Sequence, residues 1–492
     1  MKLFPKSWKW RLTLVGLLLL LVGFGTLPIM RWWVAREGRL QLEATITKLD
    51  HDEPAWRWDD LETTRPVLAD EENSAVFVGK VAPLINTQTT KLQRADKTFV
   101  SFHEGGNNRH LTDEDATLLE LALQANATVL PHLRKLANSP RGVRRLQLSP
   151  DFIGTLLPET QHTREVATLL TLEAEQFSRL GQEADALERV LWLLHLAGSL
   201  ETEPTIISQL VQIAINQIAC GRLERILGLG QAKGDVAKLQ TTLLAHAEYS
   251  WCVEGYKGER AGFHHLCENM KNGTLDAGKM LESLAQTNAA MNGNNSKEKN
   301  FVPFPGFTLR PYLDANQANL LEHITRVIAV FKLPPHERRA ALKALPPLPE
   351  GYRGIFVREF SPSADRMLDT SLRVQARLRC SGVALAVERF RVKNDRWPKN
   401  LAEIPQDLLP TLPNDPFTGM PLLYRANEQG VVIYSVGLDE KDDGGRLVHS
   451  EGPAKAQDVG FQLYNLSQRG LKPRPWPLAD WDEANLPPNG GV

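Results

Sequence analysis

Cysteine is scarce in this chain of 492 residues, which contains only Cys220, Cys252, Cys267 and Cys380. Because no two of them form a CxxC pair, the sequence excludes a zinc ribbon and a thioredoxin-like redox site. Four cysteines are also too few for a scaffold that depends on disulfide bonds. A disulfide bond between Cys252 and Cys267 is an alternative if the body is extracytoplasmic, but we expect the cysteines to be buried free thiols.

Excess charge of either sign is also lacking. The formal net charge is −1, which removes any general electrostatic attraction to nucleic acid, so we expect no nucleic-acid partner. Hydrophobic residues make up 42% of the chain, enough for a packed core and against wholesale disorder. The length allows two or three domains.

Familiar catalytic signatures are missing too. The chain has no HExxH and no GxSxG, and the glycines of GLGQAKG at 228–234 lack the Lys-Ser/Thr ending of a P-loop. His264, His265 and Cys267 lie close together, but adjacent histidines on a helix point about 100° apart, so at most one would join Cys267 on a face. We interpret them as a partly buried polar patch rather than a zinc site, and the sequence favours a protein without enzymatic activity.

One long apolar run is present, from Leu12 to Met30, bounded by Arg11 and Arg31. A helix of that length spans roughly 28 Å, close to the hydrocarbon thickness of a bilayer. Tryptophans flank it in two pairs, as in the aromatic belts of membrane proteins: Trp8, Trp10, Trp32 and Trp33. We therefore predict a single-pass signal-anchor in the cell membrane, with the N-terminus cytoplasmic and the bulk extracytoplasmic.

A cleaved signal peptide is the alternative for the same segment. Its basic start and the small residues Gly23 and Gly25 fit such a peptide. The apolar run continues through Leu27, Ile29 and Met30, however, and the second tryptophan pair would then have no membrane to occupy. The uncleaved anchor is the interpretation that we adopt.

The pattern beyond the anchor predicts a mainly α fold with a small C-terminal α+β module. The predicted parts are a basic tail (1–11), the anchor (12–30), a juxtamembrane helix with an acidic, Trp-bearing segment (31–110), a helical domain (111–345), a linker (346–362), the α+β module (363–465) and a Pro-rich tail (466–492).

Local signals place elements inside these parts. Leu42, Ile46 and Leu49 form an apolar stripe on a helix that Pro54 should end. Trp56 and Trp58 either form a ligand platform or, as we favour, pack this segment onto the body. Thr112 is expected to cap a helix whose first turn is acidic.

Farther on, two helices meet around Gly181 in a hairpin of the tetratricopeptide type, within an irregular helical array. A helix capped near Thr202 or Glu203 should run centrally through the core on Ile206, Leu210, Ile213 and Ile218, and another helix is expected over 235–255.

The C-terminal module should combine a helix over 363–394 with a hairpin formed by 422–424 and 431–436. Asp439, Asp442 and Asp443 follow, closed by Gly444 and Gly445. A tight acidic loop offers the oxygen ligands that Ca²⁺ takes, so these three aspartates are the candidate metal site. The loop is not an EF-hand, and a solvated acidic turn is the alternative.

Residues of about 383–445 resemble the C-terminal half of type II secretion pseudopilins. The resemblance rests on ALAVERFRVKNDRWP, DPFTGMPLLYR and VVIYSVGLDEKDDGG. It implies a long helix packed against a small antiparallel sheet, and an acidic loop able to bind calcium. The unit lies far downstream of the only predicted span, unlike in pseudopilins, so assembly into a pilus by the usual route is not implied.

The whole chain also resembles a family of large, uncharacterised bacterial single-pass membrane proteins. The similar features are the anchor, DEPAWRW with DEEN, EPTIISQLVQIAI followed by LERIL, GERA at 258–261, and the C-terminal module. This resemblance implies architecture and location, and it brings no catalytic residues.

The sequence thus predicts a membrane-anchored scaffold or interaction protein of the cell envelope with protein partners. Two alternatives stay open: an envelope hydrolase whose site forms only in three dimensions, and a component associated with a secretion system.

Overall fold

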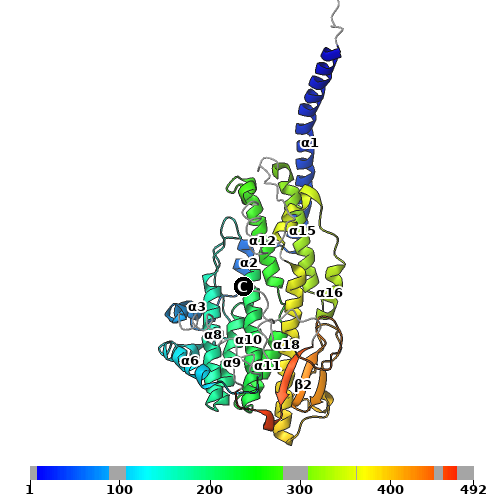
Figure 1. Ribbon diagram of the computed structural model, residues 1–492. Coiled ribbons are helices and arrows are strands. Elements are labelled where there is room, and N and C mark those ends of the chain that lie inside the picture. The colour runs from blue at the N-terminus through cyan, green and yellow to red at the C-terminus, as the bar shows by residue number, and fades with distance from the viewer. Residues whose placement is uncertain (1–7, 88–106, 281–308, 362, 448–457, 474–492) are drawn as a thin grey trace, which may run out of the picture.

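A computed structural model describes residues 8–87, 107–280, 309–361, 363–447 and 458–473, without the side chains of 8–25 and 27. The fold is mainly α-helical with one small antiparallel sheet near the C-terminus, as predicted (Figure 1). The helices are α1 (Trp8–Asp52), α2 (Trp58–Thr64), α3 (Ser74–Val81), α6 (Asp113–Gln124), α7 (Leu130–Leu133), α8 (Pro158–Arg179), α9 (Glu183–Gly198), α10 (Ile206–Leu229), α11 (Val236–Ala247), α12 (Val253–Lys271), α15 (Leu313–Phe331), α16 (Pro335–Lys343), α17 (Ile355–Phe360) and α18 (Ala364–Asn394); the strands are β1 (Leu423–Asn427), β2 (Gly430–Ser435) and β3 (Val459–Tyr464).

Helix α1 leaves the body as a single projecting helix, while its C-terminal half lies along α15 (Figure 1). Leu42 and Leu49 are buried against Ala318 and Leu321, with Ile46 half-buried beside them, which confirms the predicted stripe. The helix ends at Asp52, two residues before the proline expected to stop it.

Within the described residues, no helix has a stretch that is both apolar enough and long enough to cross a membrane. The predicted span, Leu12–Met30, lies mostly outside the residues whose side chains are described. The Pro-rich tail from 474 onward and the basic tail up to residue 7 also lie outside the described residues.

The helical hairpin predicted around Gly181 is present as α8 and α9, which pack against each other. Gly181 has φ +70°, a left-handed conformation that glycine adopts without strain and that suits the turn after a helix. Thr112 caps α6 as expected, because its hydroxyl accepts a hydrogen bond from the backbone N–H of Asp115 at 3.1 Å.

Helix α10 is central, in contact with α8, α9, α12, α18 and β3. Two details of the prediction were wrong. The cap is Thr205, whose hydroxyl accepts from the backbone N–H of Ser208, rather than Thr202 or Glu203. Leu210 and Ile218 are 38% and 39% exposed, because the buried face of α10 includes polar residues such as Gln212 and Asn216 that hydropathy alone does not place in a core.

The single helix predicted over 235–255 was also wrong. The chain forms α11, turns through 248–252, and then begins α12. Cys252 has φ +66°, a conformation that an α-helix cannot continue through, so the break is fixed at this residue.

Helix α18 and the sheet form the C-terminal module, with strand order β1-β2-β3. β1 and β2 pair as the predicted hairpin, with Asn427 opposite Gly430, and β3 adds a strand that was not predicted from the sequence. Residues of α18, β2 and β3 belong to the same hydrophobic core as α8–α12 and α15, so the helical part and the module pack as one continuous body.

Candidate functional site

A pocket of about 420 Å³ lies where the C-terminal end of α1 meets the body. Its walls come from the turn after α1 (53–56), from 61–66 in and after α2, from the turn at 202–204, from the start of α12 (254–260) and from Lys332. Segments far apart in sequence therefore converge on one space, which makes it the candidate functional site.

Gly258, the first residue of GERA, explains how α12 reaches this pocket. A Cβ atom at Gly258 would lie 1.7 Å from the carbonyl oxygen of Pro204, which no side chain tolerates. Glycine therefore lets α12 pack directly on the turn before α10, and this contact places Lys257 and Arg260 in the wall of the same pocket as Thr202 and Pro204.

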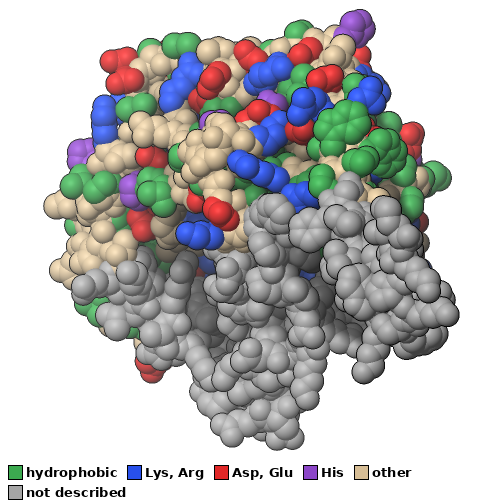
Figure 2. Space-filling view, turned by 90° about the horizontal axis from the view of Figure 1, so that it is seen from above, with side chains coloured by type: hydrophobic (Ala, Val, Ile, Leu, Met, Phe, Trp, Pro, Cys, Tyr) green, Lys and Arg blue, Asp and Glu red, His purple; other side chains and the backbone are tan. Residues whose placement is uncertain are grey.

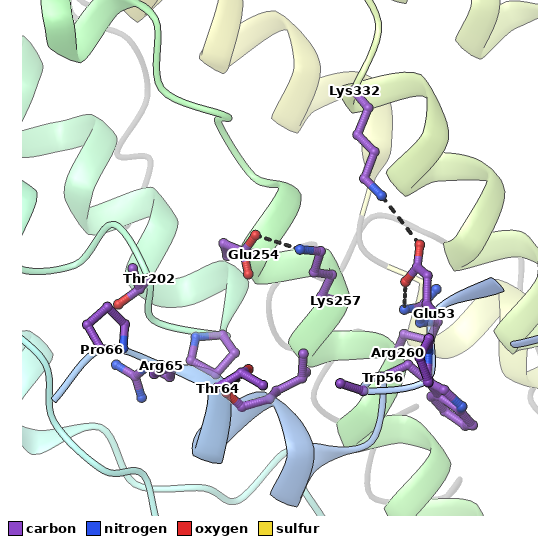
Figure 3. Close-up of a pocket in the computed structure, with 14 residues that line it drawn as sticks. Glu53, Trp56, Thr64, Arg65, Pro66, Thr202, Glu254, Lys257, Arg260 and Lys332 are labelled. Carbon is purple, nitrogen blue, oxygen red and sulfur yellow. Dashed lines mark hydrogen bonds and ion pairs between the residues drawn. The ribbon is translucent and has the colours of Figure 1, made fainter. Parts of the chain in front are cut away.

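Two groups of ion pairs lie in the pocket (Figure 3). Glu53 accepts hydrogen bonds from Arg260 and from Lys332, the latter at 3.3 Å, and Lys257 donates to Glu254 at 2.8 Å. Burial raises the pKa of Glu53, but the bond and charge of Arg260, with Lys332, outweigh it and hold that pKa below its ordinary value. Glu53 is therefore ionised and shared by two cations.

The two arginines that line the pocket, Arg65 and Arg260, are buried. Arg260 is fully buried and lies over the ring of Trp56, with its Cζ 5.8 Å from the ring centroid. Arg65 is 7% exposed, and its Nη1 donates to Glu62 Oε1 and to the carbonyl oxygen of Arg144, both at 2.7 Å. Arg65 is thus held by partners outside the pocket lining, whereas Arg260 is held by Glu53 and Trp56, which line the pocket with it.

Trp56 and Trp58 pack the acidic segment onto the body, as favoured from the sequence. Both rings are buried, and Trp56 Nε1 donates to Asp50 Oδ1 at 2.8 Å. Trp56 also lines the pocket, so part of the alternative interpretation, a platform for a ligand, is retained at one of the two tryptophans.

His264, His265 and Cys267 form a packed polar patch. His264 meets the ring of Trp56 edge-on at 4.7 Å and pairs with Gln317, while His265 pairs with Asn269. Burial lowers the pKa of His264 to about 4, so its imidazole is neutral at pH 7. All four cysteines are free and buried, as expected, and burial raises the pKa of the Cys267 thiol.

The acidic loop packs beside β2. Asp442 Oδ1 accepts from the Tyr434 hydroxyl at 3.0 Å and from the Gly444 N–H, and Asp458 accepts from the backbone N–H groups of Asp443 and Gly445. Among the described residues, no group of three or more His, Cys, Asp or Glu side chains is placed to hold a metal ion. Calcium at Asp439, Asp442 and Asp443 therefore stays a prediction.

Calcium binding at that loop has a direct test in the whole chain. If the three aspartates bind Ca²⁺, 10 mM CaCl₂ should raise the melting temperature of the purified protein by at least about 2 °C, because a ligand of the folded state stabilises it. The shift should vanish in Asp439→Asn/Asp443→Asn and persist in Asp407→Asn, an exposed site elsewhere. No shift in the folded wild-type protein would contradict the prediction.

None of the charged residues of the pocket was predicted from the sequence. GERA was the one available signal, since it contains both Gly258 and Arg260. Comparison of the chain with family models, with curated proteins and with solved structures finds no match.

Proposed function

We propose that this chain is a membrane-tethered interaction protein of the cell envelope, with α1 as anchor and stem and the body extracytoplasmic. The observation that carries the proposal is the exposure of large apolar side chains just before α1 docks on the body. Ile29, Met30, Trp32 and Trp33 are 67%, 59%, 64% and 54% exposed. Such a group is costly in water, and indole rings favour the headgroup region of a bilayer.

The stem is fixed to the body by polar as well as apolar contacts. Arg353 pairs with Glu37 at 2.8 Å and Gln41 with Asn319 at 2.8 Å, and Gly38 allows α1 to approach Ala315 closely. A helix held in this way would set a defined distance between the bilayer and the body. The outer side of α8, as part of a tetratricopeptide-like array, would offer surface to protein partners, while α9 is mostly buried beneath it.

Mixed surface charge suits such a role. On the face from which α1 projects, acidic and basic side chains lie interspersed over the described residues in view (Figure 2). A surface of this kind favours selective contacts over general attraction to a polyanion. It agrees with a formal net charge of −1 for the whole chain.

Membrane fractionation tests the anchor. The full chain should stay with the membranes after an alkaline carbonate wash and should need detergent for release. Leu19→Arg/Leu20→Asp should move it to the aqueous fraction, because two charges at the centre of a span cost several kcal/mol. Leu40→Asp, on an exposed part of the stem, is the matched control and should stay with the membranes. A wild-type chain recovered whole in the aqueous fraction would contradict the proposal.

A component associated with a secretion system is the second candidate. It is favoured by the packing of α18 on β2 and β3, the arrangement that the resemblance to pseudopilins implies. Co-purification of the detergent-solubilised chain with pseudopilins or with their inner-membrane platform would support it. Its absence under conditions that retain the platform intact would count against it.

A further inference from the structure

We infer that the pocket at the foot of α1 is a binding site for a small organic oxyanion, a molecule that carries a carboxylate or phosphate group beside an apolar part. This goes beyond the tethering role proposed above and does not depend on it. The inference rests on the charge of the pocket wall, on the unpaired donors of that wall, and on its apolar portion.

The wall has an excess of positive charge in a chain that has none overall. Four cationic side chains line the pocket, Arg65, Lys257, Arg260 and Lys332, against the two carboxylates of Glu53 and Glu254. Glu53 is shared by Arg260 and Lys332, so it neutralises neither fully. Arg65 is already paired with Glu62 outside the lining, and Lys257 with Glu254. The excess is therefore the one positive charge left by Arg260 and Lys332 on Glu53, and an anion would meet it in a partly dehydrated space.

The polar atoms left without a partner here are also of one kind. In the described lining of this pocket, the buried side-chain atoms with no hydrogen-bond partner are Nε and Nη2 of Arg65, Nε of Arg260 and Oγ1 of Thr202. All of them can donate a hydrogen bond. Buried guanidinium donors without an acceptor are costly, and an oxyanion would supply the acceptors once these side chains turn toward the pocket.

A smaller hollow of about 200 Å³ adjoins the pocket, and its described lining adds the carboxyl group of Glu201 and no lysine or arginine. It shares Thr202 and Glu254 with the pocket, and its wall contains the unpaired buried donors Gln212 Nε2 and Trp251 Nε1. Because the cations among these described residues line only the larger pocket, the anionic group of the ligand is expected there rather than in the smaller hollow.

The rest of the wall is apolar. Trp56, Leu61 and the prolines at 54, 66 and 204 occupy it, and Figure 3 shows Thr202, Pro66 and Arg65 together on the side away from Trp56. A fixed aromatic ring and three prolines favour an organic ligand over a bare inorganic ion. A volume of about 420 Å³ accommodates a small molecule.

Titration calorimetry of the full chain in detergent tests this inference. Phenyl phosphate and phenylacetate are the anionic probes, with benzyl alcohol as the neutral control and benzylamine as the cationic one. We expect at least one anionic probe to bind and both controls not to bind. The stronger of the two anions distinguishes phosphate from carboxylate as the preferred group, and inorganic phosphate alone should bind more weakly than phenyl phosphate.

Substitutions of pocket residues test whether the probe binds in this pocket. Lys257→Gln and Lys332→Gln should each lower the affinity for the stronger anionic probe about ten-fold, the loss expected for one charge-assisted hydrogen bond. Glu254→Gln should raise the affinity for that probe several-fold, because the substitution removes the carboxylate that Lys257 now binds. Lys233→Gln removes a similar Lys–Glu pair outside the pocket and should change nothing.

An increase in affinity on Glu254→Gln is a result that loss of folding cannot produce. Anionic probes that bind no better than benzyl alcohol would overturn the inference. So would affinities that Lys257→Gln, Lys332→Gln and Glu254→Gln all leave unchanged. Because every measurement uses the solubilised chain, these outcomes are separate from failure of the membrane anchor.

Discussion

Glu224→Ala is expected to lower the free energy of unfolding by about 3–5 kcal/mol, the loss typical of a buried ion pair that is deprived of one partner. Glu224 lies on α10 and is fully buried. Its carboxylate binds the guanidinium of Arg377 on α18, and its Oε1 accepts from the backbone N–H of Gln462 on β3 at 2.8 Å. One side chain thus joins the central helix to both layers of the C-terminal module.

A graded series separates the charge from the hydrogen bond. Glu224→Gln should cost less than Glu224→Ala, because the amide oxygen can still accept from Gln462 while Arg377 loses its counter-ion. Glu120→Ala breaks an exposed pair with Arg179 and should cost less than about 1 kcal/mol. Chemical denaturation followed by circular dichroism measures all three. Equal losses in Glu224→Ala and Glu120→Ala would contradict the role assigned to Glu224.

The elements that could be predicted are those whose signal is local. The cap at Thr112 was predictable because the hydroxyl and the acidic first turn act within a few residues. The turn at Gly181 was predictable for the same reason. The strand β3 was missed although Val459, Phe461 and Leu463 alternate with Gly460 and Gln462, a period of two. Its pairing with β2 depends on a partner far away in the chain.

The pocket could not be predicted, because its charges are brought together by tertiary contacts alone. Glu53, Arg65, Lys257 and Lys332 stand in four segments with no shared motif. The break at Cys252 separates α12 from α11, α12 then packs along α15, and Gly258 lets it lie directly against Pro204. Sequence periodicity indicated neither event, since a left-handed residue and a close backbone approach leave little trace in hydropathy.

The same contact creates an unusual carboxyl group beside the pocket. Glu259, next to Gly258 on α12, accepts a hydrogen bond from the backbone N–H of Ile206 at 3.2 Å, at the start of α10. Loss of hydration at this packed position raises the pKa of Glu259 to about 7, while the bond from Ile206 acts in the opposite direction and only partly offsets it. The carboxyl group is therefore half protonated near neutral pH.

Glu259→Gln is consequently expected to change the free energy of unfolding in a pH-dependent way. The change should be about 3 kcal/mol more stabilising at pH 8 than at pH 4.5. The folded chain holds the Glu259 proton up to about pH 7, whereas the unfolded chain releases it near the ordinary value of 4.5. The stability that this proton contributes is complete below pH 4.5 and is lost as the pH rises through 7. Glutamine keeps the acceptor for Ile206 without titrating.

Denaturation of wild type and Glu259→Gln at pH 4.5, 6, 7 and 8 measures the effect, with the exposed Glu428→Gln as control. The difference in unfolding free energy between Glu259→Gln and wild type should grow with pH, and the difference for Glu428→Gln should stay flat. A constant difference for Glu259→Gln would show that the carboxyl group titrates alike in the folded and unfolded chains. The packing of α12 on the turn before α10 would then leave that group hydrated.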